Sequence, residues 1–259
     1  MSTAIATTAG DLRRLAGRAL RHEARTPDAL MVNIALPVII MLLFVYVFGG
    51  AITTGSSGLA YVDFVVPAVL LMAGGYGAAL TAVSISREMT GGMIDRFRTL
   101  PISGWVVPAG FVVASVVRSV VATAIALAVA IALGFRPSAS LAEGALVLAL
   151  VFGYVLAVSA VAALWGLFVR STQAAEAFSF MVIFFPYVSD GVVPAETMPG
   201  PLRGFAEHQP TTPIVEALRA LLLDQPMGNA GWLSAIWLTA AVLISIPIAA
   251  VLFRRRTAR

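Results

Sequence analysis

The sequence predicts an all-α membrane protein with six transmembrane helices, an N-terminal interfacial amphipathic helix, and short re-entrant or interfacial helices between spans five and six. Of its 259 residues, 59% are hydrophobic and 12% are charged, about half the charged share of an ordinary soluble domain. The apolar residues fall into long blocks separated by short polar stretches. Blocks of this length cross a bilayer as helices, and the period-two alternation of a membrane β-barrel is absent.

The first predicted element is an interfacial helix at residues 9–26. Its apolar stripe is made by Leu12, Leu15, Ala16, Ala19 and Leu20, and the opposite side carries Arg14, Arg18, Arg21 and Arg25. This pattern is typical of a helix lying on an anionic membrane surface. The alternative is a solvated basic segment that only sets the orientation of the chain. A cleaved signal peptide is not indicated, because the first apolar run begins too late and is one of six.

The predicted spans are 30–50, 61–86, 105–133, 142–169, 174–193 and 230–253. Each is close to or above the roughly 20 residues that a helix needs to cross the hydrocarbon core. Span two contains Pro67 and the small residues Gly74, Gly75 and Gly77. Small residues let neighbouring helices approach closely in lipid, and they could equally loosen the helix for motion.

The most polar break between two apolar runs is the segment 87–104. Its residues Met93, Ile94, Phe97 and Leu100 share one helical face, Gly91 and Gly92 precede that helix, and Pro101 ends it. Such a helix could contact a soluble partner at the membrane surface. It could also be an ordinary interfacial loop helix.

Three ionisable residues fall inside or near predicted spans: Arg118, Glu176 and Asp190. A charge at the bilayer centre costs about 2.5–3.5 kcal/mol on insertion scales. Arg118 is therefore expected to face the bundle, a watery cavity or an acidic partner, or else to snorkel toward the interface. Glu176 is expected near one interface and Asp190 near the far end of its span.

The segment 194–229 is too polar to span and too apolar for a free loop. It is divided by Pro194, Pro199, Pro201, Pro210, Pro213 and Pro226. Leu202, Phe205 and Ala206 suggest one short amphipathic helix, and Thr212-Pro213 is a typical start for a second. Two short helices with a proline break indicate a re-entrant or interfacial element, whose non-helical backbone must be buried or line water.

The arginines predict the orientation of the chain. All 17 basic residues are arginine; 13 fall on the side that holds both termini and 3 on the other, with Arg118 within the membrane. The positive-inside rule makes the first side cytoplasmic. The segment 87–104 is then cytoplasmic and the segment 194–229 extracellular.

Several chemistries are excluded by residue content. The sequence has no cysteine and no lysine, so it contains neither a thiolate site nor a Gly-x-x-x-x-Gly-Lys-Ser/Thr phosphate loop. His-Glu-x-x-His and Gly-x-Ser-x-Gly are absent, and His22 and His208 are the only histidines. We therefore predict no catalytic residue, no metal site and no nucleic-acid binding. A transport pathway is favoured over an enzyme.

Three motifs give the chain a resemblance to a known family. They are Arg87-Glu88 with Gly91-Gly92 and Leu100-Pro101-Ile102-Ser103; Gly134-Phe135-Arg136-Pro137; and the block from Val193-Pro194-Ala195-Glu196 through Thr212-Pro213 to Ala217-Leu218-Arg219. With them the chain resembles the permease subunit of an ABC-2 type exporter, and looks most like the bacterial daunorubicin-resistance type. Asp190 departs from the apolar or neutral run that the family often has before the last motif.

The resemblance implies a multi-pass permease of the bacterial cell membrane, with both termini cytoplasmic, that moves a hydrophobic drug-like or lipid-like substrate outward. It implies a second copy or a paralogous permease, contact with membrane lipids, and a separate cytoplasmic ATPase that holds ATP and Mg, with no cofactor in this chain. The substrate path is expected at the dimer interface, along spans one, two and five. The alternatives are export of a lipid or glycan by the same fold, an ion-coupled secondary transporter using Arg118, Glu176 and Asp190, and a structural or immunity-type protein.

The resemblance also implies roles for particular residues. Contact with the ATPase is expected from Arg87, Glu88, Met89, Gly91, Gly92, Met93, Ile94, Asp95, Phe97, Leu100 and Pro101. An extracellular gate is expected from Pro194, Glu196, Met198, Pro199, Glu207, Pro210, Pro213 and Arg219.

Overall fold

The computed structural model describes residue 17 and residues 27–50, 59–91 and 106–257. Within these ranges the chain is helical and contains no strand. Five helical segments are long and apolar enough to cross a membrane: Met31–Phe48, Tyr61–Thr90, Pro108–Ala132, Leu141–Phe168 and Ala230–Arg256. The prediction of an all-α, multi-pass membrane protein is confirmed. The predicted interfacial helix at 9–26 lies, except for Gly17, outside the described residues.

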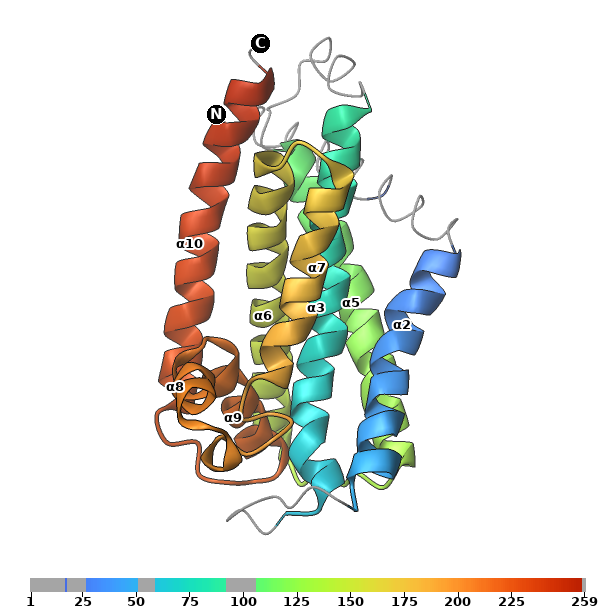
Figure 1. The fold of residues 1–259 in the computed structure, drawn as a ribbon, viewed down its shortest axis with the longest axis vertical. Coiled ribbons are helices and arrows are strands. Elements are labelled where there is room, and N and C mark those ends of the chain that lie inside the picture. Colours follow the sequence, from blue (N-terminus) through green and yellow to red (C-terminus); the bar gives the residue numbers. More distant parts are fainter. Residues whose placement is uncertain (1–16, 18–26, 51–58, 92–105, 258–259) are drawn as a thin grey trace.

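The long helices run lengthwise through the molecule (Figure 1). They are α2 (Pro27–Leu42), which continues as the π-helix η1 (Leu43–Phe48), α3 (Tyr61–Thr90), α5 (Val106–Ala132), α6 (Leu141–Phe168) and α10 (Ala230–Thr257). One end of the bundle holds Arg87, Arg170 and Arg254–Arg256, and we call it the arginine end. The opposite end, where the short helix α9 lies, is called the α9 end.

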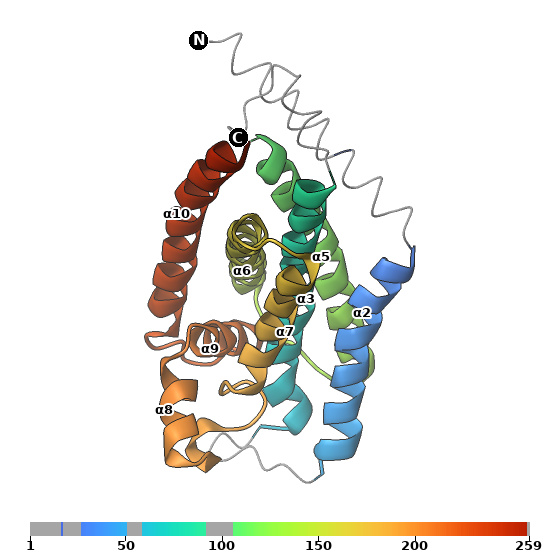
Figure 2. The same ribbon diagram turned by 45° about the horizontal axis from the view of Figure 1, so that its top comes forward.

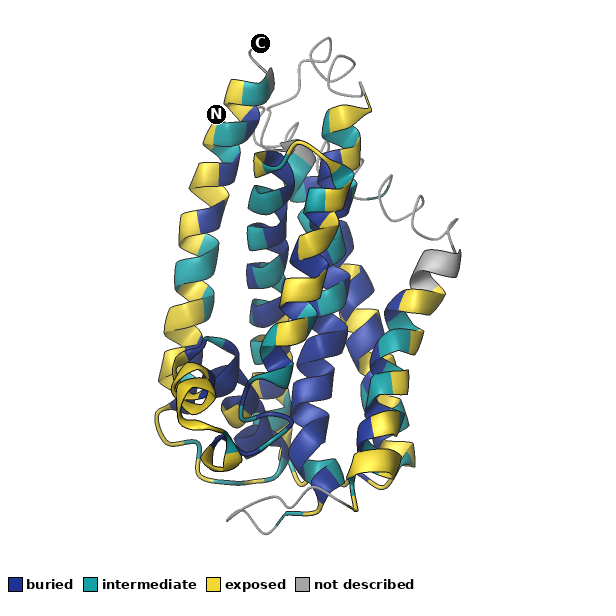
Figure 3. Ribbon diagram, in the orientation of Figure 1, coloured by how far each residue is buried: buried dark blue, intermediate teal, exposed yellow. Residues whose placement is uncertain are grey.

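Helix α3 is the centre of the bundle. It packs on α2, α5, α6 and α7, and 83% of its apolar window is buried inside the protein, against 17% for α10. Figure 3 shows this difference as a dark central helix flanked by helices with exposed outer faces. Glycine allows the close approach: a Cβ at Gly166 of α6 would lie 2.5 Å from the carbonyl oxygen of Ala82 in α3. Span two is therefore a packing core.

The fifth predicted span is shorter than expected. Its helix α7 covers Thr172–Tyr187, 16 residues, or about 24 Å against a hydrocarbon core of about 30 Å. The helix ends where the Ser189 hydroxyl donates to the Pro186 carbonyl at 2.6 Å and accepts the Gly191 N–H at 3.0 Å. The following backbone is buried among protein segments, which satisfies the requirement for non-helical chain at membrane depth.

Short helices follow α7, as the sequence predicts. They are the 3₁₀ turn η3 (Ala195–Thr197), α8 (Gly200–His208) and α9 (Thr211–Leu222). Figure 2 shows α9 lying across the bundle between α10 and α7. Its residues are almost all buried, and the Leu222 carbonyl accepts the Ser138 N–H from the α5–α6 connection at 2.9 Å. Helix α9 is therefore a buried element that closes this end of the bundle, and we call it the α9 plug, whereas α8 is mostly exposed.

Candidate functional site

The residues expected to contact an ATPase begin at the arginine end of α3. Arg87 is exposed, Glu88 and Met89 are half-buried, and Gly91 closes the helix with an N–H bond to the Arg87 carbonyl at 2.8 Å. Met89 packs against a small cluster that includes Ile85 and Phe253, which joins α3 to α10. Gly92, Met93, Ile94, Asp95, Phe97, Leu100 and Pro101 lie outside the described residues. Residues 87–91 thus form the solvent-facing end of α3, the most buried of the long helices.

Arg118 lies inside the bundle and does not snorkel. Its side chain is 9% exposed, and Nε and Nη2 donate to the Gly77 carbonyl at 3.2 and 2.6 Å. Gly77 is close to polar groups of two other helices, since a Cβ there would lie 2.6 Å from Ser119 Oγ and 3.2 Å from Asn33 Oδ1. Of the two sequence-based alternatives, the bundle-facing one is correct.

The same region holds buried polar groups without hydrogen-bond partners. These are both amide atoms of Asn33 and the hydroxyls of Thr81, Ser119 and Thr123. One turn away, Ser115 and Ser159 do pair, at 2.9 Å. A polar seam therefore runs where α2, α3 and α5 meet, and only the charge of Arg118 pointed to it in the sequence.

The three ionisable residues do not form one cluster. Glu176 is exposed on α7, about 17 Å along the helix from its end at Tyr187. Asp190 lies beyond that end and pairs with Arg219. Among the described residues, no group of three His, Cys, Asp or Glu side chains could hold a metal ion.

Arg219 and Asp190 form a partly buried ion pair at the α9 end. Nη1 of Arg219 lies 3.2 Å from Asp190 Oδ2, and Nη2 donates to the carbonyls of Asp190 at 2.8 Å and Phe64 at 3.1 Å. The guanidinium carbon also lies 4.0 Å from the centre of the Phe64 ring, a cation–π contact. Burial lowers the pKa of Arg219, and the Asp190 carboxylate opposes that shift.

The pair connects three segments. Asp190 Oδ1 accepts the Ala195 N–H at 2.8 Å, and the Tyr61 hydroxyl donates to the Val192 carbonyl at 3.3 Å. The start of α3, the turn after α7 and helix α9 are therefore held together. The sequence singled out Asp190 and Arg219 separately, but no helical spacing links residues 29 apart across a non-helical break.

The remaining residues expected at the gate are spread over the α9 end. Pro194 and Pro213 are buried, Met198 and Pro210 are half-buried, and Glu196, Pro199 and Glu207 are exposed. Glu207 forms an exposed ion pair with Arg203 at 2.7 Å. Of the expected gate residues, Pro194, Pro213 and Arg219 are therefore buried at this end, and Arg219 pairs with Asp190.

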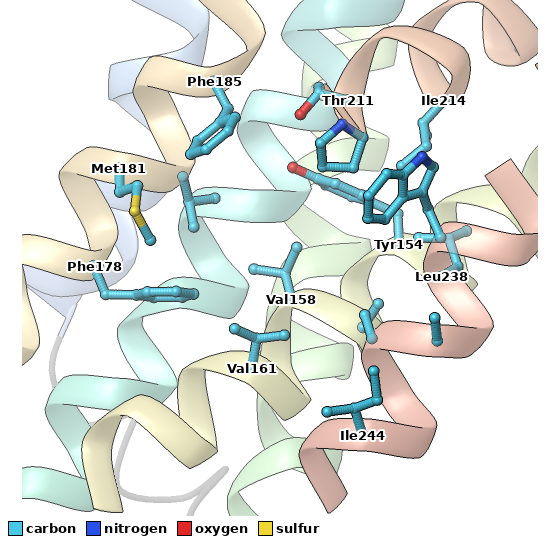
Figure 4. Close-up of a pocket in the computed structure, with 16 residues that line it drawn as sticks. Tyr154, Val158, Val161, Phe178, Met181, Phe185, Thr211, Ile214, Leu238 and Ile244 are labelled. Atoms are coloured by element: carbon cyan, nitrogen blue, oxygen red, sulfur yellow. The ribbon is translucent and has the colours of Figure 1, made fainter. Parts of the chain in front are cut away.

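An apolar pocket lies between α6, α7, α9 and α10. It encloses about 340 Å³. Its walls include Val158 and Val161 from α6, Phe178, Met181 and Phe185 from α7, Ile214 from α9, and Trp237, Ala241 and Ile244 from α10. Figure 4 shows Thr211 and Tyr154 toward one end of the pocket and Ile244 and Val161 toward the other. No charged side chain lines it, so it suits a hydrocarbon group. No motif or periodicity in the sequence indicated this pocket.

Comparisons with known proteins agree over most of the chain. Residues 11–223 match a family model described as ABC-2 type transporter. The chain is 29% identical over 249 residues to a daunorubicin resistance ABC transporter permease protein of Streptomyces coeruleorubidus, covering 93% of this chain and 85% of that protein. It is 25% identical over 236 residues to a probable doxorubicin resistance ABC transporter permease protein of Mycobacterium tuberculosis, covering 88% and 84%. The matched range ends just after α9.

Proposed function

Because the chain belongs to the ABC-2 type transporter family, we propose that it is the permease subunit of an exporter driven by ATP hydrolysed on a separate polypeptide. The observation that carries this proposal is the family match over residues 11–223 in a chain of 259 residues that contains no lysine for a phosphate loop. The ATP, the Mg²⁺ and the hydrolytic residues would belong to the partner.

The proposed route of coupling starts at residues 87–101. A cytoplasmic ATPase would press on this segment, and α3 would carry the displacement, since it contacts α2, α5, α6 and α7. An element that touches four neighbours cannot shift without moving them, because packed interiors deform little. The described residues of that segment are exposed at Arg87, Thr90 and Gly91 and half-buried at Glu88 and Met89.

The proposed substrate is a hydrophobic, drug-like molecule. Two similar permeases are named for resistance to daunorubicin and to doxorubicin. We expect the path at the interface with a second permease. Helices α2 and α7 present exposed apolar side chains, among them Met31, Ile39, Phe180 and Phe184. The residues of α3 that share one helical face, Tyr76, Leu80 and Ser84, are only half-buried. Helix α3, the second span, would therefore line the inner surface of the path, and α2 and α7 would form its sides.

The experiment combines the permease with a candidate ABC-type ATPase subunit from the same organism. We expect the two to co-purify and the reconstituted complex to hydrolyse ATP faster when an anthracycline is added. Glu88→Ala and Phe97→Ala should reduce this stimulation and leave the folded yield unchanged, whereas Arg203→Ala, at the α9 end, should alter neither. Normal drug transport by both the Glu88→Ala and the Phe97→Ala variants would refute the proposal that residues 87–101 dock on the ATPase. Transport without any ATPase, driven by an ion gradient, would refute the proposal itself; stimulation by a lipid or glycan alone would change the substrate class.

A further inference from the structure

The apolar pocket opens sideways between α7 and α10. Helix α10 packs on α6 and α9, whereas α7 packs mainly on α3, so α6 forms the floor between them. The side chains on the two rims are exposed, with Met181 on α7 and Trp237 and Ile244 on α10. On α10 the neighbouring apolar side chain of Leu243 is exposed too. In a membrane protein such faces contact lipid, so the pocket is continuous with the lipid-facing surface.

The dimensions of the pocket match one hydrocarbon chain. From Trp237 to Ile244 the lining of α10 extends about 10 Å along the helix, and one leaflet of the hydrocarbon core is about 15 Å thick. If a methylene group takes about 30 Å³, the volume of a water molecule in the liquid, the cavity of about 340 Å³ holds about eleven such groups. A single turn of an α-helix, about 10 Å across and 5.4 Å long, takes roughly 420 Å³. A whole helical turn of a second copy therefore does not fit inside the pocket, although side chains of such a helix could enter it.

The chemistry of the walls also separates a lipid from a drug. Drug-sized ligands are oriented by a few convergent polar groups, and here the polar side-chain groups of the lining are the hydroxyls of Tyr154 and Thr211 and the indole N–H of Trp237, which stands on the exposed rim. Thr211 stands toward the α9 side of the pocket (Figure 4). The remaining surface is aliphatic and aromatic, which suits a flexible chain that can follow an irregular wall. An apolar void beside fluid lipid would forfeit dispersion contacts on every side.

We propose that this pocket holds one acyl chain of a phospholipid from the leaflet at the α9 end, wedged between α7 and α10 on the floor of α6. The lipid enters laterally, its head group stays at the membrane surface near Trp232 and Trp237, and its hydrocarbon reaches toward Ile244. Tryptophans at the end of a span commonly mark the head-group level. The site is independent of the proposed export activity, since it requires no partner protein and no nucleotide.

The test uses the full chain in nanodiscs that contain phosphatidylglycerol with a diazirine near the end of one acyl chain. After photolysis and proteolysis, we expect labels on Val158 or Val161, the pocket floor, as well as on the exposed faces of α7 and α10. Bulk lipid reaches the exposed faces, but it reaches the floor only through the pocket. Labels confined to exposed faces would overturn the proposal.

Two variants of α10 provide the matched comparison. Ala241→Phe fills the pocket and should lower labelling of the floor about fivefold or more, whereas Ala235→Phe adds the same side chain at an exposed position and should not. Equal labelling in both variants would overturn the proposal. So would loss of floor labelling on addition of doxorubicin but not of excess unlabelled phospholipid, because the pocket would then belong to the substrate. A photoreactive amino acid introduced at position 158 that cross-links to a second copy, with no lipid label on the pocket floor, would assign the pocket to that copy and overturn the proposal as well.

Discussion

The guanidinium of Arg219 contacts groups from two segments that lie far from it in the sequence, around Phe64 and around Asp190. It forms an ion pair with the side chain of Asp190, lies over the Phe64 ring in a cation–π contact, and donates to the backbone carbonyls of Phe64 and Asp190. Charged groups with this many partners are rarely replaceable one at a time, because removal of one partner leaves the other charge buried without compensation.

Arg219→Ala should therefore destabilise the protein by about 3 kcal/mol, near the lower part of the range for broken buried pairs. Asp190→Ala should cost a similar amount, and the double variant should cost clearly less than the two single losses together. The measurement is thermal unfolding in detergent. Arg203→Ala, which breaks an exposed pair with Glu207, is the control and should change stability by about 0.5 kcal/mol or less. Additive losses would show that the pair does not act as a unit.

Arg118→Ala tests the second buried arginine. It removes a large buried side chain and its two hydrogen bonds to the Gly77 carbonyl. The free energy of unfolding should therefore fall by about 2–4 kcal/mol, which lowers both the folded yield and the unfolding temperature. Arg118→Met keeps most of the volume without the charge and should recover much of that loss.

A transport assay then separates the roles of that side chain. If Arg118→Met folds well but exports poorly, the charge serves transport; if it exports normally, the residue serves packing. Arg255→Ala, exposed at the arginine end, is the control for loss of an arginine as such. No effect of Arg118→Ala on yield or transport would contradict the buried position of the guanidinium.

Helices α3 and α6 approach each other closely at Gly166. A Cβ there meets the carbonyl oxygen, Cα and carbonyl carbon of Ala82 at 2.5, 3.0 and 3.1 Å, and none of these backbone atoms can rotate aside. The contact joins the central helix to the helix that forms the pocket floor.

Gly166→Ala should force the two helices apart and destabilise the protein by about 1–3 kcal/mol, despite the better helix propensity of alanine. Gly144→Ala in the same helix is the matched control, since nothing lies within 4 Å of its Cβ position; it should be neutral or stabilising by up to about 1 kcal/mol. Unfolding temperatures of the two variants decide the matter. A neutral Gly166→Ala would mean that the helices have room to separate.

The elements could be predicted to different degrees. Long apolar blocks specify helices by composition alone, so the spans containing Gly77, Arg118 and Gly166 were expected close to their observed bounds. The end of α7 was not, because the block 174–193 stays apolar while Ser189 hydrogen-bonds the backbone and stops the helix. The pocket arises from contact between α6, α7, α9 and α10. The Arg219–Asp190 pair arises from contact between α9, the turn after α7 and the start of α3. Periodicity within one segment carries no information about such contacts.

The whole molecule is asymmetric in charge along its long axis. Arg87, Arg170 and Arg254–Arg256 stand at one end of the bundle, and Arg136, Arg203 and Arg219 stand at the other. Membrane insertion retains arginine-rich loops on the cytoplasmic side, so this asymmetry predicts that the arginine end faces the cytoplasm. The α9 end would then face outward, and the apolar pocket would open sideways into the outer leaflet.

The lack of native cysteine makes this orientation directly measurable, because a single introduced thiol carries no background. Ser138→Cys and Gln173→Cys place exposed thiols beyond the two ends of α6. A membrane-impermeant maleimide should label Ser138→Cys in intact cells and Gln173→Cys only after the membrane is opened, because one helix of 28 residues separates them by about 40 Å. Reversed labelling would invert the orientation and remove residues 87–101 from the reach of a cytoplasmic ATPase. Labelling of both in intact cells would mean that α6 does not span, and the bundle as a transmembrane unit would fail with it.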